Sequence, residues 1–181
     1  MAAATRSIRF TGEVVEVGTV LLVRLPADAS AALPSRGQVA VTGTFAGKEL
    51  ATVVEPDGRR GHWIRVTPAL RRAAKAKPGD DVDVVLDVAP EWPEPEVPDD
   101  LGAALAEAPQ EIQHLWDDIT PMARWEWVRW VGATANPDTR AKRVDVTISK
   151  MEHGKRRPCC FDLSSCTDPA VSRSGKLVEP S

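Results

Sequence analysis

The chain has 181 residues, of which 27% are charged and 43% are hydrophobic, with a net charge of −3; this suits a globular protein that buries a core without disulfides. No apolar run approaches the roughly 20 residues that span a bilayer, and the first residues show no secretory signal. The cysteines, at positions 159, 160 and 166, are odd in number and clustered, which suits a reducing compartment, so we expect a cytoplasmic protein with no membrane span.

Two-residue alternation of apolar side chains dominates residues 1–88 and predicts β-strands. Gly12 interrupts the first strand as a bulge or a point of close approach. Ala46-Gly47 is a tight turn that makes the third and fourth strands a hairpin. A helix over residues 69–77, with Thr67-Pro68 as its N-cap and first residue, precedes the last strand. Six short strands with one apolar face each predict a small β-barrel. The strands cover residues 8–17, 19–25, 38–45, 49–54, 62–66 and 82–88.

The apolar period changes at residues 89–98, which hold four prolines and three glutamates and predict an extended linker. Residues 99–157 then follow a helical period. Residues 158–181 are predicted to be an irregular, cysteine-containing tail. The fold class is therefore α+β, with a barrel followed by a helical module. The predicted helices cover residues 101–108, 111–117, 122–131 and 137–153, with caps at Asp99-Asp100, Thr120 and Asn136 and with Gly154 after the last.

Short motifs in the barrel segment resemble a bacterial domain family of unknown function. The resemblance implies a double-split β-barrel, because that family is similar to the barrels that include AbrB-like DNA-binding domains. The motifs are Leu25-Pro26, Val39-Ala40-Val41-Thr42-Gly43-Thr44, Gly47, Leu70-Arg71-Arg72-Ala73 and Gly79-Asp80-Asp81-Val82-Asp83-Val84.

The second half of the chain resembles the YdeI/OmpD-associated family, often labelled bacteriocin-protection proteins. The resemblance implies a helical module and supplies no catalytic residues. The chain departs from the family at Trp125 and Trp127, where tyrosine or a smaller residue is common. The matching motifs are Pro98-Asp99-Asp100-Leu101 to Ala104-Leu105, Arg124 to Val128 with Trp130, Pro137-Asp138-Thr139-Arg140 with Arg143, and Gly154-Lys155-Arg156.

Aromatic and basic side chains are dense between residues 122 and 157, where exposed aromatic groups and cations would bind apolar and anionic groups. Our leading hypothesis is a non-enzymatic binding or stress-protection protein whose ligand, a small molecule or a peptide, lies between barrel and helices. The alternative is that the tryptophans are buried between helices and that the cations are solvated or pair with acidic residues 94–100. The predicted ligand-binding residues are Trp125, Trp127, Trp130, Arg140 and Arg143.

The charges fall into blocks, with a basic excess in residues 1–77 and 124–157 and no Lys or Arg in residues 78–123. Such blocks usually attract one another within the chain, and the alternative is a basic surface that meets a polyanion. The second functional hypothesis is therefore a regulator that binds DNA through its barrel, as AbrB-like domains do, although the acidic block would repel DNA. Its phosphate contacts would be Arg59, Arg60, Arg71, Arg72, Lys75 and Lys77.

Catalytic and metal-binding patterns are weak in this sequence. Histidines occur only at positions 62, 114 and 153, in three different segments, and no phosphate-binding loop, dinucleotide fingerprint or nucleophile elbow occurs. We therefore predict no enzymatic activity, cofactor or metal, and an enzyme of unrecognised type is the third hypothesis. The only metal-ligand candidates in proximity lack the usual spaced cysteine pair; they are His153, Cys159, Cys160 and Cys166.

Overall fold

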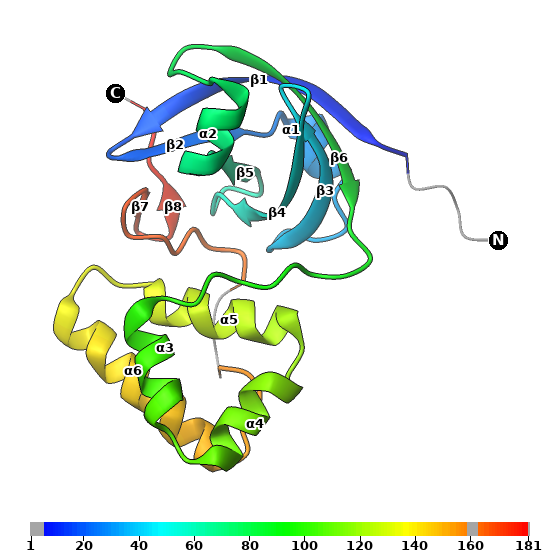
Figure 1. Cartoon of the computed structure of the whole chain (residues 1–181). Coiled ribbons are helices and arrows are strands. Elements are labelled where there is room, and N and C mark those ends of the chain that lie inside the picture. The colour runs from blue at the N-terminus through cyan, green and yellow to red at the C-terminus, as the bar shows by residue number, and fades with distance from the viewer. Residues whose placement is uncertain (1–5, 159–162, 181) are drawn as a thin grey trace. The chain divides into compact units, whose positions relative to one another are not determined.

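The computed structural model describes residues 6–158 and 163–180, which form two compact units (Figure 1). The first unit contains the described residues up to Trp92, together with Leu163–Cys166 and the residues from Ala170 onward. The second unit begins at Pro93 and also includes Thr167–Pro169. The predicted α+β fold is confirmed, because strands make up a barrel in the first part of the chain and helices follow it.

The first unit is a closed barrel of six antiparallel strands in the order β1-β2-β5-β4-β3-β6. β1 has two neighbours, since its first part pairs with β6 and its last part pairs with β2. All six predicted strands are present. Their bounds are β1 (Ile8–Val17), β2 (Val20–Arg24), β3 (Val39–Phe45), β4 (Lys48–Pro56), β5 (His62–Arg65) and β6 (Asp81–Val88).

Gly12 lies where β1 passes from one neighbour to the other. A Cβ atom at this position would lie 2.6 Å from Cγ1 of Val23, so only glycine lets the two strands approach this closely. The predicted close approach is confirmed. The alternating strands place their apolar side chains in one barrel core, which includes Val14, Val41, Phe45, Val54, Ile64, Val84 and Leu86.

In the part of the first unit that the structure describes, two short helices accompany the barrel, of which the sequence predicted one. The helix α2 (Pro68–Ala74) begins at Thr67, whose hydroxyl accepts a hydrogen bond from the amide of Leu70. It ends earlier than predicted, because Lys75 adopts a left-handed conformation with φ 54°. The helix α1 (Ala27–Ala31) was not predicted, since five residues with no side-chain cap carry neither a period nor a start signal.

The described residues of the second unit form four helices, as predicted. Thr120 and Asn136 cap the third and fourth of them with side-chain hydrogen bonds, and Gly154 follows the last helix with φ 75°. Within the described part of the chain, no helix is long and apolar enough to cross a membrane. The helices are α3 (Asp99–Glu107), α4 (Gln110–Asp118), α5 (Pro121–Gly132) and α6 (Pro137–Glu152). Their shared core includes Leu101, Leu105, Ile112, Ile119, Trp127, Val131, Val144 and Met151.

The C-terminal segment differs from the irregular tail predicted over residues 158–181. It contains a hairpin of two-residue strands, β7 (Ser172–Arg173) and β8 (Lys176–Leu177). The turn residues Ser174 and Gly175 both have positive φ, which matches the hairpin geometry, but the strands are too short to show a period. The hairpin belongs to the first unit, where Cys166, Val171 and Leu177 join a second apolar cluster. This cluster also contains Val17, Val20, Leu22 and Trp63.

We predict that Gly43→Ala destabilises the barrel by about 2–4 kcal/mol. A Cβ atom at Gly43 would lie 1.9 Å from the carbonyl oxygen of Val85, and the φ of 151° is one that other residues rarely adopt. Urea unfolding followed by the NMR signals of Ile64 measures the change. Thr42→Ala, an exposed position on the same strand, is the control and should cost less than about 1 kcal/mol; equal losses from both variants would contradict the steric explanation.

Candidate functional site

Trp127, one of the predicted ligand-binding residues, lies in the core of the helical unit. Its side chain is fully buried, and its indole N–H donates to the carbonyl oxygen of Arg156 at 3.0 Å. Every part of the ring that could meet a ligand is therefore covered by the protein itself. Trp127 positions its neighbours, and its ring lies edge-on to that of Trp130 with the centroids 6.1 Å apart.

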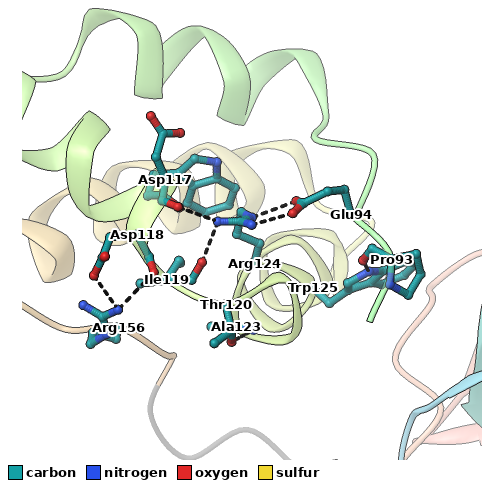
Figure 2. A network of polar contacts seen from close by, with 11 residues as sticks. Pro93, Glu94, Asp117, Asp118, Ile119, Thr120, Ala123, Arg124, Trp125 and Arg156 are labelled. Atoms are coloured by element: carbon teal, nitrogen blue, oxygen red, sulfur yellow. Dashed lines mark hydrogen bonds and ion pairs between the residues drawn. The ribbon is translucent and has the colours of Figure 1, made fainter. Parts of the chain in front are cut away.

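Trp125 and Arg124 fasten the start of the helical unit to α5, as Figure 2 shows. The indole N–H of Trp125 donates to the carbonyl oxygen of Pro93 at 2.6 Å. The Arg124 guanidinium donates from Nε to Glu94 at 2.8 Å and forms a second bond to the same carboxylate. Both interactions hold residues that precede α3, so these side chains serve the architecture of the unit.

Arg124 also completes the end of α4 (Figure 2). Its Nη1 donates to the carbonyl oxygens of Trp116 at 2.8 Å and Ile119 at 2.6 Å. The last carbonyl groups of a helix lack an amide partner within the helix, and Pro121 provides no N–H. Nearby, Arg156 donates to the Asp118 carboxylate at 2.8 Å. No sequence pattern indicated this cap, because the donor lies beyond the helix that it completes.

Arg140, another predicted ligand-binding residue, is occupied by an internal ion pair. Its Nε and Nη2 donate to the two carboxylate oxygens of Asp100 at 2.6 and 3.0 Å, which joins α6 to the first turn of α3. These hydrogen bonds hold the pKa of Asp100 below its ordinary value and raise the pKa of Arg140. The alternative weighed for the sequence, that the cations pair with residues 94–100, is correct for this arginine.

Glu126 is a buried carboxylate that was not predicted from the sequence. Glu126 lies on α5 with only 5% of its surface exposed, and both of its oxygens accept hydrogen bonds from Arg157. These bonds raise the pKa of Arg157. A buried carboxylate without such a partner would cost several kcal/mol, so this pair is structural. Its only sequence signal was a lone glutamate among tryptophans.

Trp130 and Arg143 are two predicted residues that lie beside each other, and Lys150 joins them. The Arg143 guanidinium carbon lies 5.3 Å and Lys150 Nζ lies 5.6 Å from the centre of the Trp130 ring, within the range of cation–π attraction. All three residues are half-buried. Within the described residues, neither cation pairs with a carboxylate, although Arg143 donates to the carbonyl oxygen of Trp130 at 2.8 Å.

The residues of α6 separate by charge around the helix. At about 100° per residue, three of the four cations of α6, Lys142, Arg143 and Lys150, fall within an arc of about 100°, and Arg140 extends it to about 160°. The helix's three acidic residues fall within a separate arc of about 40°; they are Asp138, Asp145 and Glu152. The half-buried ring of Trp130, on α5, lies against Arg143 and Lys150 of this basic side. The candidate site is therefore Trp130, Lys142, Arg143 and Lys150.

The six barrel cations proposed to contact DNA are exposed but do not form one group. Arg59 and Arg60 lie in the loop that precedes His62, whereas α2 follows Arg65, so the loop and the helix extend from opposite ends of β5. The other four cations lie on α2 or just after it; they are Arg71, Arg72, Lys75 and Lys77. The DNA-binding hypothesis stays a prediction, and at most these four cations form one group.

A buried histidine and serine pair connects α1 to β5. Nδ1 of His62 lies 2.5 Å from Oγ of Ser30, and Nε2 lies 3.0 Å from the carbonyl oxygen of Gly37. A carbonyl can only accept, so Nε2 carries the proton and the Ser30 hydroxyl donates to Nδ1. Burial lowers the pKa of His62. The pair resembles a nucleophile and its base in composition only, because both residues are at least 98% buried.

The weak metal-ligand candidates form no site among the residues that the structure describes. Exposed His153 lies at the end of α6, where its ring bonds to the carbonyl oxygen of Ser149 at 2.7 Å. Cys166 is buried in the apolar cluster of the first unit. Cys159 and Cys160 lie outside the described residues.

Two segments of the chain match known families. Residues 10–86 match the family model described as a domain of unknown function, DUF1905, and residues 94–154 match the one described as bacteriocin-protection, YdeI or OmpD-associated. Both resemblances predicted from the sequence are therefore confirmed. The first match contains most of the barrel, and the second contains α3 to α6. A search of curated proteins finds no significant match.

If the barrel binds duplex DNA, we predict that it contacts the phosphates through no more than four cations, those at α2. The logarithm of the binding constant should then fall against the logarithm of salt concentration with a slope no steeper than about −4. Gel shifts between about 50 and 200 mM salt measure this slope. The variant Arg59→Gln/Arg60→Gln should leave it unchanged. A slope near −6 that this variant lowers would show that both groups contact DNA together.

We predict that the barrel loses stability as the pH falls below about 6.5, the ordinary pKa of histidine. Because burial lowers the pKa of His62 in the folded state, the unfolded state binds more protons between the two pKa values, so acidification favours unfolding. Urea unfolding of the barrel from about pH 7.5 to 5 tests this dependence. His62→Gln should reduce the dependence of the unfolding free energy on pH in this range. His114→Gln, at an exposed position, should leave that dependence unchanged.

Proposed function

We propose that the chain is a non-enzymatic binding protein whose helical unit holds an anionic group at Trp130, Arg143 and Lys150. The observation that carries the proposal is the state of the cations in this unit. Arg124, Arg140, Arg156 and Arg157 each form an ion pair with a carboxylate of the same unit. Arg143 and Lys150, beside the Trp130 ring, have no such partner among the described residues.

The Trp130 surface suits a carboxylate or phosphate that is attached to an apolar or planar group. A guanidinium has five N–H donors, and the hydrogen bond from Arg143 Nη1 to the Trp130 carbonyl oxygen uses one of them. The remaining donors and the Lys150 ammonium can bind anionic oxygens. The half-buried indole beside them offers a rigid apolar contact. A small acidic molecule or an acidic side chain of a protein has this combination of groups.

The family descriptions support a binding role. One matched family is described as bacteriocin-protection and the other as of unknown function, and neither description names a reaction. Protection by capture of a molecule requires only a binding surface. The one nucleophile and base pair described above, Ser30 with His62, is closed to substrate by burial. We accordingly propose a binding protein of the cytoplasm, with no cofactor of its own.

We predict that Arg143→Gln weakens the binding of pyrophosphate and citrate, used as phosphate and carboxylate probes, by about tenfold. Titrations followed by the indole N–H signals in NMR spectra measure the affinity, and the Trp130 signal should shift most. Lys155→Gln removes the same charge from an exposed position and should change the affinity by less than about twofold. Equal losses from both variants, or no binding of either probe, would count against the proposal.

A further inference from the structure

The barrel is closed between β4 and β5 by only two residue pairs. Glu55 pairs with Trp63, and Pro56 pairs with His62. The rest of β5 pairs with β2, on its other side. In the part of the chain that the structure describes, residues 49–53 of β4 therefore have β3 as their only strand neighbour. The opposite edge of this segment is an open strand edge within an otherwise closed sheet.

The backbone groups at this edge can be identified from the hairpin register. The two-residue turn makes Phe45 and Lys48 the hydrogen-bonded pair next to the turn. From there, non-hydrogen-bonded and hydrogen-bonded residue pairs alternate along β3 and β4. Leu50 and Thr52 consequently bond to β3, whereas the N–H and C=O groups of Glu49 and Ala51 point away from it. Glu49 and Ala51 are exposed residues, and no hydrogen bond of the described chain takes up their outward backbone groups.

The open edge faces a groove whose other side is formed by α2. The groove has a volume of about 300 Å³, at the lower end of the range for ligand sites. Ala51 and Thr52 line it on the β4 side, and Ala69 and Ala73 line it on the helix side. These side chains are short, so an extended chain would meet the backbone edge at Ala51, between the larger side chains of Leu50, Arg65 and Leu70 that also line the groove.

The charges around the groove select an acidic occupant. Arg71, Arg72 and Lys75 are exposed on α2 and at its end, and none of them pairs with a carboxylate among the described residues. Among the described residues, Glu49 and Arg65 are the charged residues that line the groove, and the three α2 cations lie outside its lining. A basic peptide would be repelled by the α2 cations, whereas an acidic one would be attracted to them.

We propose that the edge of β4 between Glu49 and Val53 binds an extended acidic peptide as an added β-strand. The peptide backbone would bond to the outward N–H and C=O groups of Glu49 and Ala51, and its acidic side chains would lie near the α2 cations. Open strand edges pair readily with a further strand, and proteins otherwise cover or shorten them. This site lies in the barrel and does not depend on the function proposed for Trp130.

The test uses the full chain and a short synthetic peptide of alternating valine and glutamate, with a valine–lysine peptide for comparison. Amide hydrogen exchange should show that Glu49 and Ala51 exchange fast in the free protein, while Leu50 and Thr52 are already protected. Addition of the glutamate peptide should slow the exchange of Glu49 and Ala51 by about tenfold or more. The lysine peptide should have no such effect.

Ala51→Pro supplies the decisive variant, because proline removes the outward N–H and is tolerated on strand edges. We expect it to weaken peptide binding by about tenfold, as measured by fluorescence anisotropy, and to leave the NMR spectrum of the barrel core unchanged. Ala51→Thr keeps the N–H and should bind as the original chain does. If Ala51→Pro disturbs the core, a glutamate peptide with methylated backbone nitrogens tests the reciprocal bonds, from the peptide N–H groups to the outward C=O groups of Glu49 and Ala51, on the unaltered protein.

Several outcomes would overturn the proposal. Peptide binding that leaves the exchange of Glu49 and Ala51 unchanged would mean attraction by charge alone. Equal binding of the lysine peptide would remove the argument for an acidic occupant. Protection of both amides without peptide, with dimers that form as concentration rises, would assign the edge to a second copy of the chain. Absence of binding by the glutamate peptide would contradict the proposal directly.

Discussion

The hydrogen bonds of Arg124 are the interaction on which the helical unit depends. One guanidinium completes the carbonyl groups at the end of α4 and also binds the carboxylate of Glu94, a residue that precedes α3. The chain turns sharply between α4 and α5, and Pro121 at this turn has no N–H to offer. Without an arginine here, the carbonyl groups of half-buried Trp116 and buried Ile119 would lack a donor, which costs about 1–3 kcal/mol for each group.

Ion pairs within the helical unit distinguish its structural arginines from the cations that are available to a ligand. The acidic partners Glu94, Asp100 and Asp118 come from the stretch without basic residues, and their arginines come from the basic stretch that follows it. The attraction between charge blocks that the sequence indicated is thus present as particular ion pairs. The cations of α6 beside Trp130 stand apart from this pattern. The candidate site therefore includes cations that the ion pairs of this unit leave available.

Features that depend on local chemistry could be predicted from the sequence, and features that depend on distant contacts could not. Alternating side chains and the Ala46-Gly47 turn predicted the strands, and Thr120 and Asn136 predicted two helix starts. By contrast, α1 has no cap and the hairpin of residues 172–177 has two-residue strands. The same limit applies to the site, because three nearby tryptophans share one helix and only tertiary packing decides which is buried.

Burial of Trp127 illustrates the point, since its neighbour Trp130 differs from it in exposure but not in residue type. A helix that is apolar on nearly all sides gives no indication of which side meets other helices. The pairing of His62 with Ser30 joins residues 32 positions apart, and neither of them belongs to a recognisable motif. Composition alone therefore indicated the region of the candidate site, and the contacts of each side chain are the basis on which we propose its members.

The opening between β4 and β5 has a structural cause that also shapes the groove beside it. β5 has only four residues, and after its first two it continues along β2 and away from β4. The space left at this point is filled from α2 by Leu70, which joins the barrel core together with Leu50 of β4. A helix side chain thus closes the core where strand pairing stops, but it cannot satisfy the backbone of the strand edge. Closure by a helix therefore seals the apolar interior of the barrel and leaves polar backbone groups of β4 available at its surface.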